Sequence, residues 1–415
     1  MKAQLDNALK KSNATAQWQL TQLDTLHHLV NYTFYPGNTI RKGKLKGVDT
    51  SIIQEETLSQ LLFWKTNTPY NSIQINNRLI NELKNKGLNL TYHQIFFSDS
   101  IADLRISVEK IAKNQFQGLL GTINQDNKTI LIGEVKSQWI NSFKRAEKFF
   151  FHWQRQSIST QRLEGEINFP VVFRSPFGIQ QSIEMYRNQN IFFIVGARGA
   201  LNYRTTNGSI IQVKYETKNH NALIQSQTIQ HRLFGLGVIQ NFSEFKDFTY
   251  SLNFGFLRGF KNTIDLEGEK RNPLIKTELD LTIERKSKRF FTSLAIHQRG
   301  IYLQNDLAQI EKNRIGGVET IRGFGQESIF CSKYLGGQFE SGWNYSSFGR
   351  IFLFYDQGWI QNTTNSAAYW QGVGFGGMFN VPDGQIEISS GWGIPDGQKI
   401  ELRNNLIHIQ YQVFF

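Results

Sequence analysis

The C-terminal three quarters of the chain is a succession of segments in which apolar and polar residues alternate. In one of them Thr277, Leu279, Leu281 and Ile283 fall on one face of an extended strand, and polar or charged residues fall on the other. The segments are separated by Asn, Gly, Ser, Lys and Pro, which are typical turn residues. A strand with one apolar and one charged face fits a sheet that has lipid on one side and water on the other.

From Phe116 to the C-terminus the pattern predicts about sixteen strands, the first over 117–123 and the last over 405–415. An even number of antiparallel strands suits a closed bacterial outer-membrane barrel. If both ends of the barrel domain lie on the periplasmic side, the turns after odd-numbered strands face outward. The long segment 304–331 follows the eleventh predicted strand and is therefore the sixth external loop.

Aromatic residues support the membrane interpretation. Six tryptophans fall toward the ends of predicted strands, where two interfacial girdles are expected: Trp139, Trp153, Trp343, Trp359, Trp370 and Trp392. The alternative is a soluble β-sandwich or propeller with core tryptophans. Against it stands the last strand, where Ile407, Ile409, Tyr411, Val413 and Phe415 alternate with polar residues and the chain ends on an aromatic side chain.

The first 112 residues have a different pattern. Residues 1–36 predict a helix followed by two strands, and residues 37–112 predict a β-α-α-β-β unit with strands over 40–47, 88–97 and 104–108 and helices over 52–64 and 73–86. A Thr68-Pro69-Tyr70-Asn71 break precedes the second helix. Asn71 or Ser72 is the expected N-cap of that helix, and Gly87 the expected residue after its end.

Charge and cysteine content narrow the choice of function. The chain has 46 Lys+Arg against 34 Asp+Glu and a net charge of +12, but the basic residues are scattered, which argues against a nucleic-acid surface. The single cysteine, Cys331, excludes an intrachain disulfide and a multi-cysteine metal site. No apolar run is long enough for a membrane helix. No signal peptide is recognised at the start, so either the protein stays inside the cell or the chain lacks its true beginning.

Catalytic and cofactor motifs are not found. Residues 372–377 match GxGxxG, but they lie within a predicted strand and open no helix, so nucleotide binding is not expected and the glycines are predicted to let the strand bend. No GxSxG, HExxH or P-loop pattern occurs, and the eight histidines are scattered. The sequence predicts no catalytic residues, no cofactor, no metal site and no enzymatic activity.

Two short motifs remain. The long loop contains Ile321-Arg322-Gly323-Phe324 within a glycine-dense segment, and a later strand reads Phe352-Leu353-Phe354-Tyr355-Asp356-Gln357-Gly358. By alternation Phe352, Phe354 and Asp356 share one face of that strand. A carboxylate does not face lipid when a lumen is available, so Asp356 is expected to point inward.

These motifs resemble the (V/I)RG(F/Y) loop and the FxFxDxG strand of the BamA/TamA superfamily of outer-membrane assembly and translocation proteins. The β-α-α-β-β unit resembles a polypeptide-transport-associated (POTRA) domain. The resemblance implies a truncated POTRA domain over 1–36, a POTRA domain over 37–112 and a transmembrane barrel over 113–415. Its sixteen antiparallel strands would enclose loop 304–331.

The family pattern assigns residues as well as the fold. Arg322 would meet Asp356 inside the lumen, with Glu340 as a second acceptor. Ile321, Gly323, Phe324, Phe352, Phe354 and Gly358 complete the two motifs, and Tyr411, Val413 and Phe415 form the terminal-strand signal.

The function implied is assembly or insertion of unfolded polypeptides in the bacterial outer membrane. The POTRA part would lie in the periplasm and receive clients by strand addition, and the barrel would offer an openable seam. Outer-membrane lipid, unfolded outer-membrane or secreted polypeptides and periplasmic or lipoprotein accessory subunits are the implied partners; nucleic acid is not. The alternatives are a two-partner-type secretion transporter, the barrel part of a larger patatin-like lipase and a passive porin.

Overall fold

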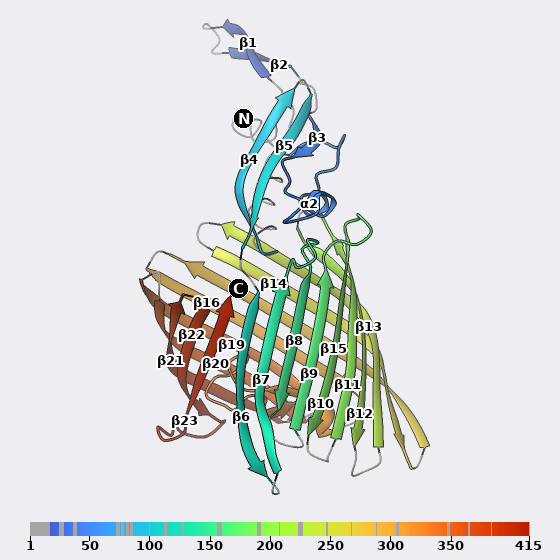
Figure 1. The fold of residues 1–415 in the computed structure, drawn as a ribbon, viewed down its shortest axis with the longest axis vertical. Helices are drawn as coiled ribbons and strands as arrows, with labels where there is room; N and C mark the ends of the chain where they lie inside the picture. Colours follow the sequence, from blue (N-terminus) through green and yellow to red (C-terminus); the bar gives the residue numbers. More distant parts are fainter. Residues whose placement is uncertain are drawn as a thin grey trace. The chain divides into compact units, whose positions relative to one another are not determined.

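The computed structural model describes residues 17–24, 29–35, 40–71, 75, 79, 83, 86–98, 100–111, 114–125, 128–155, 160–188, 192–206, 208–222, 227–245, 248–266, 268–287, 289–303, 307–346, 349–363, 366–382 and 384–414. These residues form two compact units (Figure 1). One comprises the chain up to Ile111 with two short segments, 141–147 and 171–176, and the other is the remaining, mostly β-structured part.

The first unit begins with a hairpin of β1 (Gln17–Asp24) and β2 (Leu29–Tyr35), which pair antiparallel. These are the two strands predicted within 1–36, and the helix predicted before them lies outside the described residues. A three-stranded sheet follows in the order β3 (Arg41–Lys46), β5 (Ile101–Lys110), β4 (Leu88–Ser98). β3 runs parallel to β5, and β4 runs antiparallel to it, so β4 is an edge strand.

Helix α2 (Glu55–Leu62) is shorter than the 52–64 predicted from the apolar spacing. The backbone of Gln54 is still extended, with φ −67° and ψ 134°, and Phe63 has a left-handed backbone, with φ 51°. The helix therefore begins after, and ends before, the apolar residues at the two ends of the predicted range. Leu58, Leu61 and Leu62 are fully buried because they share one face of the helix. From the second predicted helix the structure describes three buried helical positions, Ile75, Leu79 and Leu83.

The second unit is a closed barrel of sixteen antiparallel strands in sequence order. The last strand, β23, pairs with the first, β6, and this pairing closes the barrel. The strands are β6 (Gln115–Gln125), β7 (Lys128–Ile140), β8 (Lys148–Arg155), β9 (Thr160–Phe169), β10 (Phe177–Asn188), β11 (Phe192–Arg204), β12 (Ile210–Ala222), β13 (Gln227–Phe245), β14 (Phe248–Asp265), β15 (Gly268–Lys286), β16 (Phe290–Leu303), β19 (Lys333–Ser346), β20 (Gly349–Thr363), β21 (Ser366–Val381), β22 (Gly384–Ile394) and β23 (Asn405–Phe414).

Burial along β20 shows how the alternation is used. Leu353 is 69% exposed and Tyr355 42%, whereas Phe354 is 3% exposed and Asp356 is fully buried. The apolar outer face and the charged inner face are those of a transmembrane barrel, so the predicted fold class is confirmed. No helix within the described ranges is long and apolar enough to cross a membrane.

Two details differ from the sequence prediction. The alternation in the sequence predicts a ninth strand over 245–257, but in the structure Phe245 ends β13 and pairs with Phe248, because the alternation continues past the apolar band to the turn. Trp370 was expected in a lipid-facing girdle. It instead packs against Phe324 of the long loop, with ring centroids 4.9 Å apart, because its partner Gly358 lies on the lumenal face of β20.

The long loop between β16 and β19 contains a short 3-10 helix, η1 (Gln309–Glu311), and a small hairpin of β17 (Asn313–Ile315) and β18 (Ile329–Cys331). Its buried apolar residues, which include Ile315 and Ile321, form a cluster with Tyr334 of β19 and Ile360 of β20. Both strand residues point into the barrel, so the loop is folded into the lumen.

Candidate functional site

The centre of the loop is a bidentate ion pair. Arg322 Nε donates to Asp356 Oδ2 at 2.8 Å and Arg322 Nη2 donates to Asp356 Oδ1 at 2.7 Å. The backbone N–H of Arg322 donates to Asp356 Oδ2 as well, at 2.8 Å. Asp356 is fully buried and Arg322 is 5% exposed. The planar guanidinium suits this contact because its donors match the two carboxylate oxygens.

Two further groups complete the surroundings of Arg322. Its Nη1 donates to Glu340 Oε2 on β19 at 2.9 Å, so two carboxylates face one guanidinium. The ring of Phe354 lies under the guanidinium, 3.8 Å from Cζ. Asp356, Glu340 and Phe354 therefore hold one loop residue from two neighbouring strands.

Glycines make the close approach of the loop possible. A Cβ at Gly372 would lie 2.1 Å from Arg322 O, and a Cβ at Gly358 would lie 2.4 Å from Ile321 Cδ1. Gly323 has φ +87°, a backbone conformation that favours glycine, and its Cβ would meet Gly393 N at 2.4 Å. Gly372, predicted from the sequence to let β21 bend, thus makes room for the loop backbone.

The loop has a second anchor on a different part of the wall. Glu311, at the end of η1, accepts from Lys261 Nζ of β14 at 2.6 Å and lies 2.7 Å from His231 Nε2 of β13. Lys261 and His231 are opposite each other in the β13–β14 register. Glu311 and His231 have no exposed side-chain surface, so the contact between them is shielded from water.

A third anchor lies at the base of the small hairpin. Glu327 accepts a hydrogen bond from Arg162 Nη1 of β9, and Arg314 Nη1 of β17 lies 3.5 Å from its other carboxylate oxygen. Arg314 in turn stacks on Tyr186 of β10, with Cζ 3.9 Å from the ring centroid. The loop is therefore held to strands around the lumen and not only to β19 and β20.

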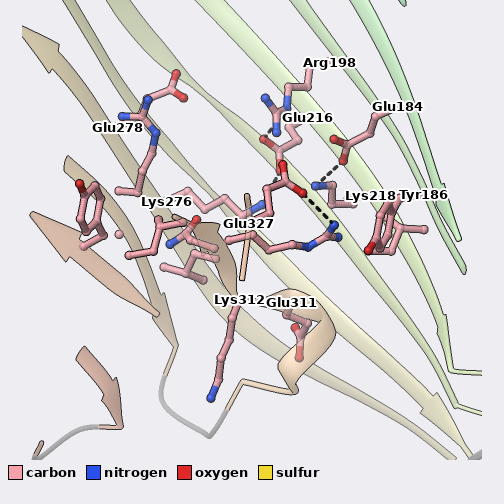
Figure 2. A pocket seen from close by; sticks show the side chains of 18 of the residues that line it. Glu184, Tyr186, Arg198, Glu216, Lys218, Lys276, Glu278, Glu311, Lys312 and Glu327 are labelled. Atoms are coloured by element: carbon pink, nitrogen blue, oxygen red, sulfur yellow. Dashed lines mark hydrogen bonds and ion pairs between the residues drawn. The ribbon is translucent and has the colours of Figure 1, made fainter. Parts of the chain in front are cut away.

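Between the loop and the wall lies a cavity of about 440 Å³ lined by charged side chains (Figure 2). Glu216 lies against Lys276 and Arg198, and Lys218 contacts Glu184. These residues come from strands β10, β11, β12 and β15. Acidic and basic groups are paired across the cavity, so it is polar without a strong excess of either sign.

The other candidate feature is the seam where the barrel closes. Among the described residues β23 and β6 form two pairs, Val413 with Phe116 and Phe414 with Gln115. By comparison β7 and β8 pair along Gly133–Ile140, and β14 and β15 along Phe248–Asp265. From Gln117 onward, the edge of β6 that faces β23 has no strand partner within the described ranges.

The terminal-strand residues lie at this seam. Tyr411 is 46% exposed on the outer face of β23, and Val413 is one of the two paired residues. The Gln412 side chain donates to Gln115 Oε1 across the seam. Phe415 lies outside the described residues.

Sequence reasoning found the Arg322 contact but missed the others. Glu311 is separated from His231 by 80 residues, and Glu327 from Arg162 by 165. No spacing rule connects such residues, because their contact depends on the register of the whole barrel and on the path of the loop. The alternation along each strand indicates only that His231 and Arg162 face the lumen, and it does not indicate their partners.

Comparison with known proteins shows the fold. No protein-family model matches the sequence, and a search of curated proteins gives no match. The solved structure of CdiB from Escherichia coli aligns with a TM-score of 0.73 at 13% identity, over 100% of this chain and 83% of that one. CdiB from Acinetobacter baumannii aligns with a TM-score of 0.66 at 17% identity, over 99% and 80%. The similarity at these identities is one of fold.

Proposed function

We propose that this chain is a non-enzymatic outer-membrane factor that inserts unfolded polypeptide through the seam between β6 and β23. The observation that carries the proposal is the pairing at that seam, which in the part of the chain that the structure describes is limited to Phe116–Val413 and Gln115–Phe414. Each missing ladder pair leaves backbone N–H and C=O groups that can bind another strand. A client strand could therefore pair with β6 without first breaking a long ladder.

The lumenal loop supports the same function in a different way. With Arg322, Glu311 and Glu327 bound to the wall, the loop occupies the lumen. A passive porin needs an open water-filled lumen, so the anchored loop argues against that alternative. Because the loop occupies the lumen, the seam is the route by which a client can enter the membrane without displacement of the loop.

The first unit is assigned the role of receiving clients. In the sheet order β3-β5-β4, one edge of strand β4 has no strand partner among the residues described, and β4 carries the exposed aromatic residues Tyr92, Phe96 and Phe97. An extended peptide can add to such an edge through main-chain hydrogen bonds. We assign this unit as a POTRA domain on the periplasmic side of the outer membrane, and the resemblance of the predicted β-α-α-β-β unit to such domains is the second support.

Secretion of a polypeptide through the lumen is the second candidate. The cavity of about 440 Å³ beside the loop favours it, because its paired charges suit a hydrated chain better than a lipid-facing strand. Passage along this route would require the loop anchors to open. The patatin-like lipase alternative would place its catalytic part outside this chain.

A seam disulfide tests the proposal. In a Cys331→Ser background, Phe116→Cys with Val413→Cys joins the paired positions of the seam, which antiparallel neighbours allow. Insertion of a client barrel into proteoliposomes should stop in the oxidised protein and return on reduction. The matched control, Ile388→Cys with Ile409→Cys, joins β22 to β23 and leaves the seam free, so it should remain active. Full activity of the locked seam would reject insertion through it.

A further inference from the structure

The outer surface of the barrel carries a cluster of three arginines on adjacent strands. They are Arg232 of β13, Arg258 of β14 and Arg271 of β15, and all three are exposed. The lumenal side carries buried leucines: Leu233 and Leu257 adjoin the first two arginines, and Leu274 lies three residues after Arg271. Side chains alternate along a strand, so the arginines point away from the lumen.

The register places the three arginines next to one aromatic residue, Phe260, on the outer face of the sheet. Arg232 lies directly opposite Phe260, and Arg258 precedes Phe260 by two residues on the same face of β14. Arg271 is opposite Asn262, and its Cζ lies 3.7 Å from the Phe260 ring centroid. Direct and diagonal neighbours on one face of a sheet lie within reach of long side chains.

The outward residues next to the cluster indicate its position relative to the apolar band of the barrel. On β13 the outward Phe234 and Leu236 follow Arg232, and they are 64% and 61% exposed. On β14 the outward Phe254 and Phe256 precede Arg258. The cluster thus borders the apolar band at the end of the barrel that β14 reaches near Asp265. Strands alternate in direction, so β14 and β6 run the same way, and this end is opposite to the one where the chain enters the barrel.

The charges of the cluster are not neutralised by the protein. Among the described residues, none of the three arginines forms an ion pair with a carboxylate. The nearest outward carboxylate along β15 is that of Glu269, two residues beyond Arg271, and it is exposed. The outer surface at this cluster therefore carries a net positive charge that can bind an anion.

We propose that Arg232, Arg258 and Arg271 bind the phosphorylated headgroup of a lipid in the leaflet at this end of the barrel. The forked guanidinium groups match phosphate oxygens, and an anion between them would be shared by three strands. The acyl chains of the same lipid would lie on Phe234 and Leu236. The ring of Phe260 holds Arg271 in the cluster, so that the site is formed before the lipid arrives.

Arg285 provides a matched control. It lies on the same strand as Arg271 at the opposite end of the barrel, is exposed, and stacks on Phe248 with Cζ 5.4 Å from the ring centroid. It has no second arginine opposite it in the register. If stacking and charge alone created the site, Arg285 would bind the same lipid.

Binding of bis-phosphorylated lipid A to the purified full chain in zwitterionic detergent, measured by native mass spectrometry, tests the proposal. The triple variant R232Q/R258Q/R271Q should bind on the order of a thousandfold more weakly, since each of the three charge-assisted contacts contributes about tenfold. Single variant R258Q, which keeps the Arg271–Phe260 stack, should lose about tenfold. Variant R285Q should bind like the wild type, and all variants should retain a heat-modifiable barrel.

Two further arms identify the ligand. Lipid A from which the phosphates have been removed should bind no better than phosphatidylcholine, and inorganic phosphate in large excess should leave lipid A bound because it cannot replace the acyl chains. The proposal is overturned if the triple variant and the wild type bind equally, if the dephosphorylated lipid binds equally well, or if R285Q loses as much as R258Q. Displacement by inorganic phosphate would overturn the assignment to a lipid.

Discussion

Arg322 and Asp356 form a buried bidentate ion pair, with Nε–Oδ2 and Nη2–Oδ1 distances of 2.8 and 2.7 Å. Arg322 belongs to the loop and Asp356 to β20, so this pair connects the loop to the barrel wall. Removing one member leaves the other charge without its partner, at a cost of up to roughly 3 to 5 kcal/mol that lumenal water lowers.

We therefore expect Arg322→Ala and Asp356→Ala each to expose the loop to protease. The double variant should lose about as much protection as either single variant, because the pair is lost once. Glu340→Gln should have a smaller effect, since it removes one acceptor and leaves the bidentate contact. Limited proteolysis in detergent measures this cycle. Additive losses would show that the two residues are not coupled.

Gly372→Ala should displace the loop without changing any charge. The new Cβ would meet Arg322 O at 2.1 Å, a contact that only movement of the loop backbone relieves. The control is Gly337→Ala on β19, where the nearest atom to the new Cβ is 4.0 Å away. Protease protection of the loop should fall for Gly372→Ala and remain for Gly337→Ala. Equal protection in both variants would contradict the close contact between the Arg322 backbone and Gly372.

Glu311→Gln tests the second anchor. The change leaves Lys261, which is 6% exposed, without its carboxylate, so loop protection should fall by an amount corresponding to as much as about 3 kcal/mol. Glu401→Gln, in an exposed turn before β23, serves as a control for loss of a carboxylate. Hydrogen exchange of the amides of η1 and β17 reports the effect. Unchanged exchange in Glu311→Gln would mean that the contact of Glu311 with Lys261 and His231 does not hold the loop.

A pH-dependent effect is expected in the first unit. The Lys46 ammonium, 2.7 Å away, and the backbone N–H of Lys44 lower the pKa of the Asp103 carboxyl from its ordinary value. A carboxyl whose pKa is lower in the folded state stabilises that state above its ordinary pKa, and the contribution is lost as the pH falls through the lowered value. Asp103 lies partly at the surface, so the effect should be about 1 kcal/mol or less.

The comparison of wild type with Asp103→Asn measures this contribution. The variant should be less resistant to proteolysis within residues 40–111 at neutral pH, and the difference should disappear in acid. A difference that persists at low pH would show that Asp103 acts through its hydrogen bonds alone.

The barrel could be predicted from the sequence because a membrane imposes a simple rule on each strand. Alternation gave the sixteen strands and the inward direction of Asp356, and a short motif pointed to Arg322 as its partner. Strand ends were less certain, since in β13 the alternation continues to Phe245, beyond the apolar band. The same limit applied to Trp370, whose lumenal direction depends on its pairing with Gly358.

Contacts between distant segments could not be predicted. Lys214 of β12 reaches Glu278 of β15 over two intervening strands, and Glu311 reaches β13 and β14 from the loop. Each contact requires the register of several strands and the shape of the lumen at once. The short ladder at the seam is likewise a property of the register between β6 and β23. Gly118 and Gly121 weaken a strand without determining its register, so the sequence of β6 does not predict which residues pair.

Crosslinking of an arrested client tests the central claim most directly. A client barrel protein with a cysteine in its C-terminal strand, stopped during insertion by a folded fusion, is presented to two variants in the Cys331→Ser background. Gly118→Cys lies on β6 beyond its pairs with β23, and Ser182→Cys lines the lumen on β10. Insertion through the seam predicts a disulfide with Gly118→Cys and none with Ser182→Cys. A disulfide with Ser182→Cys and none with Gly118→Cys would contradict the account and place the client in the lumen.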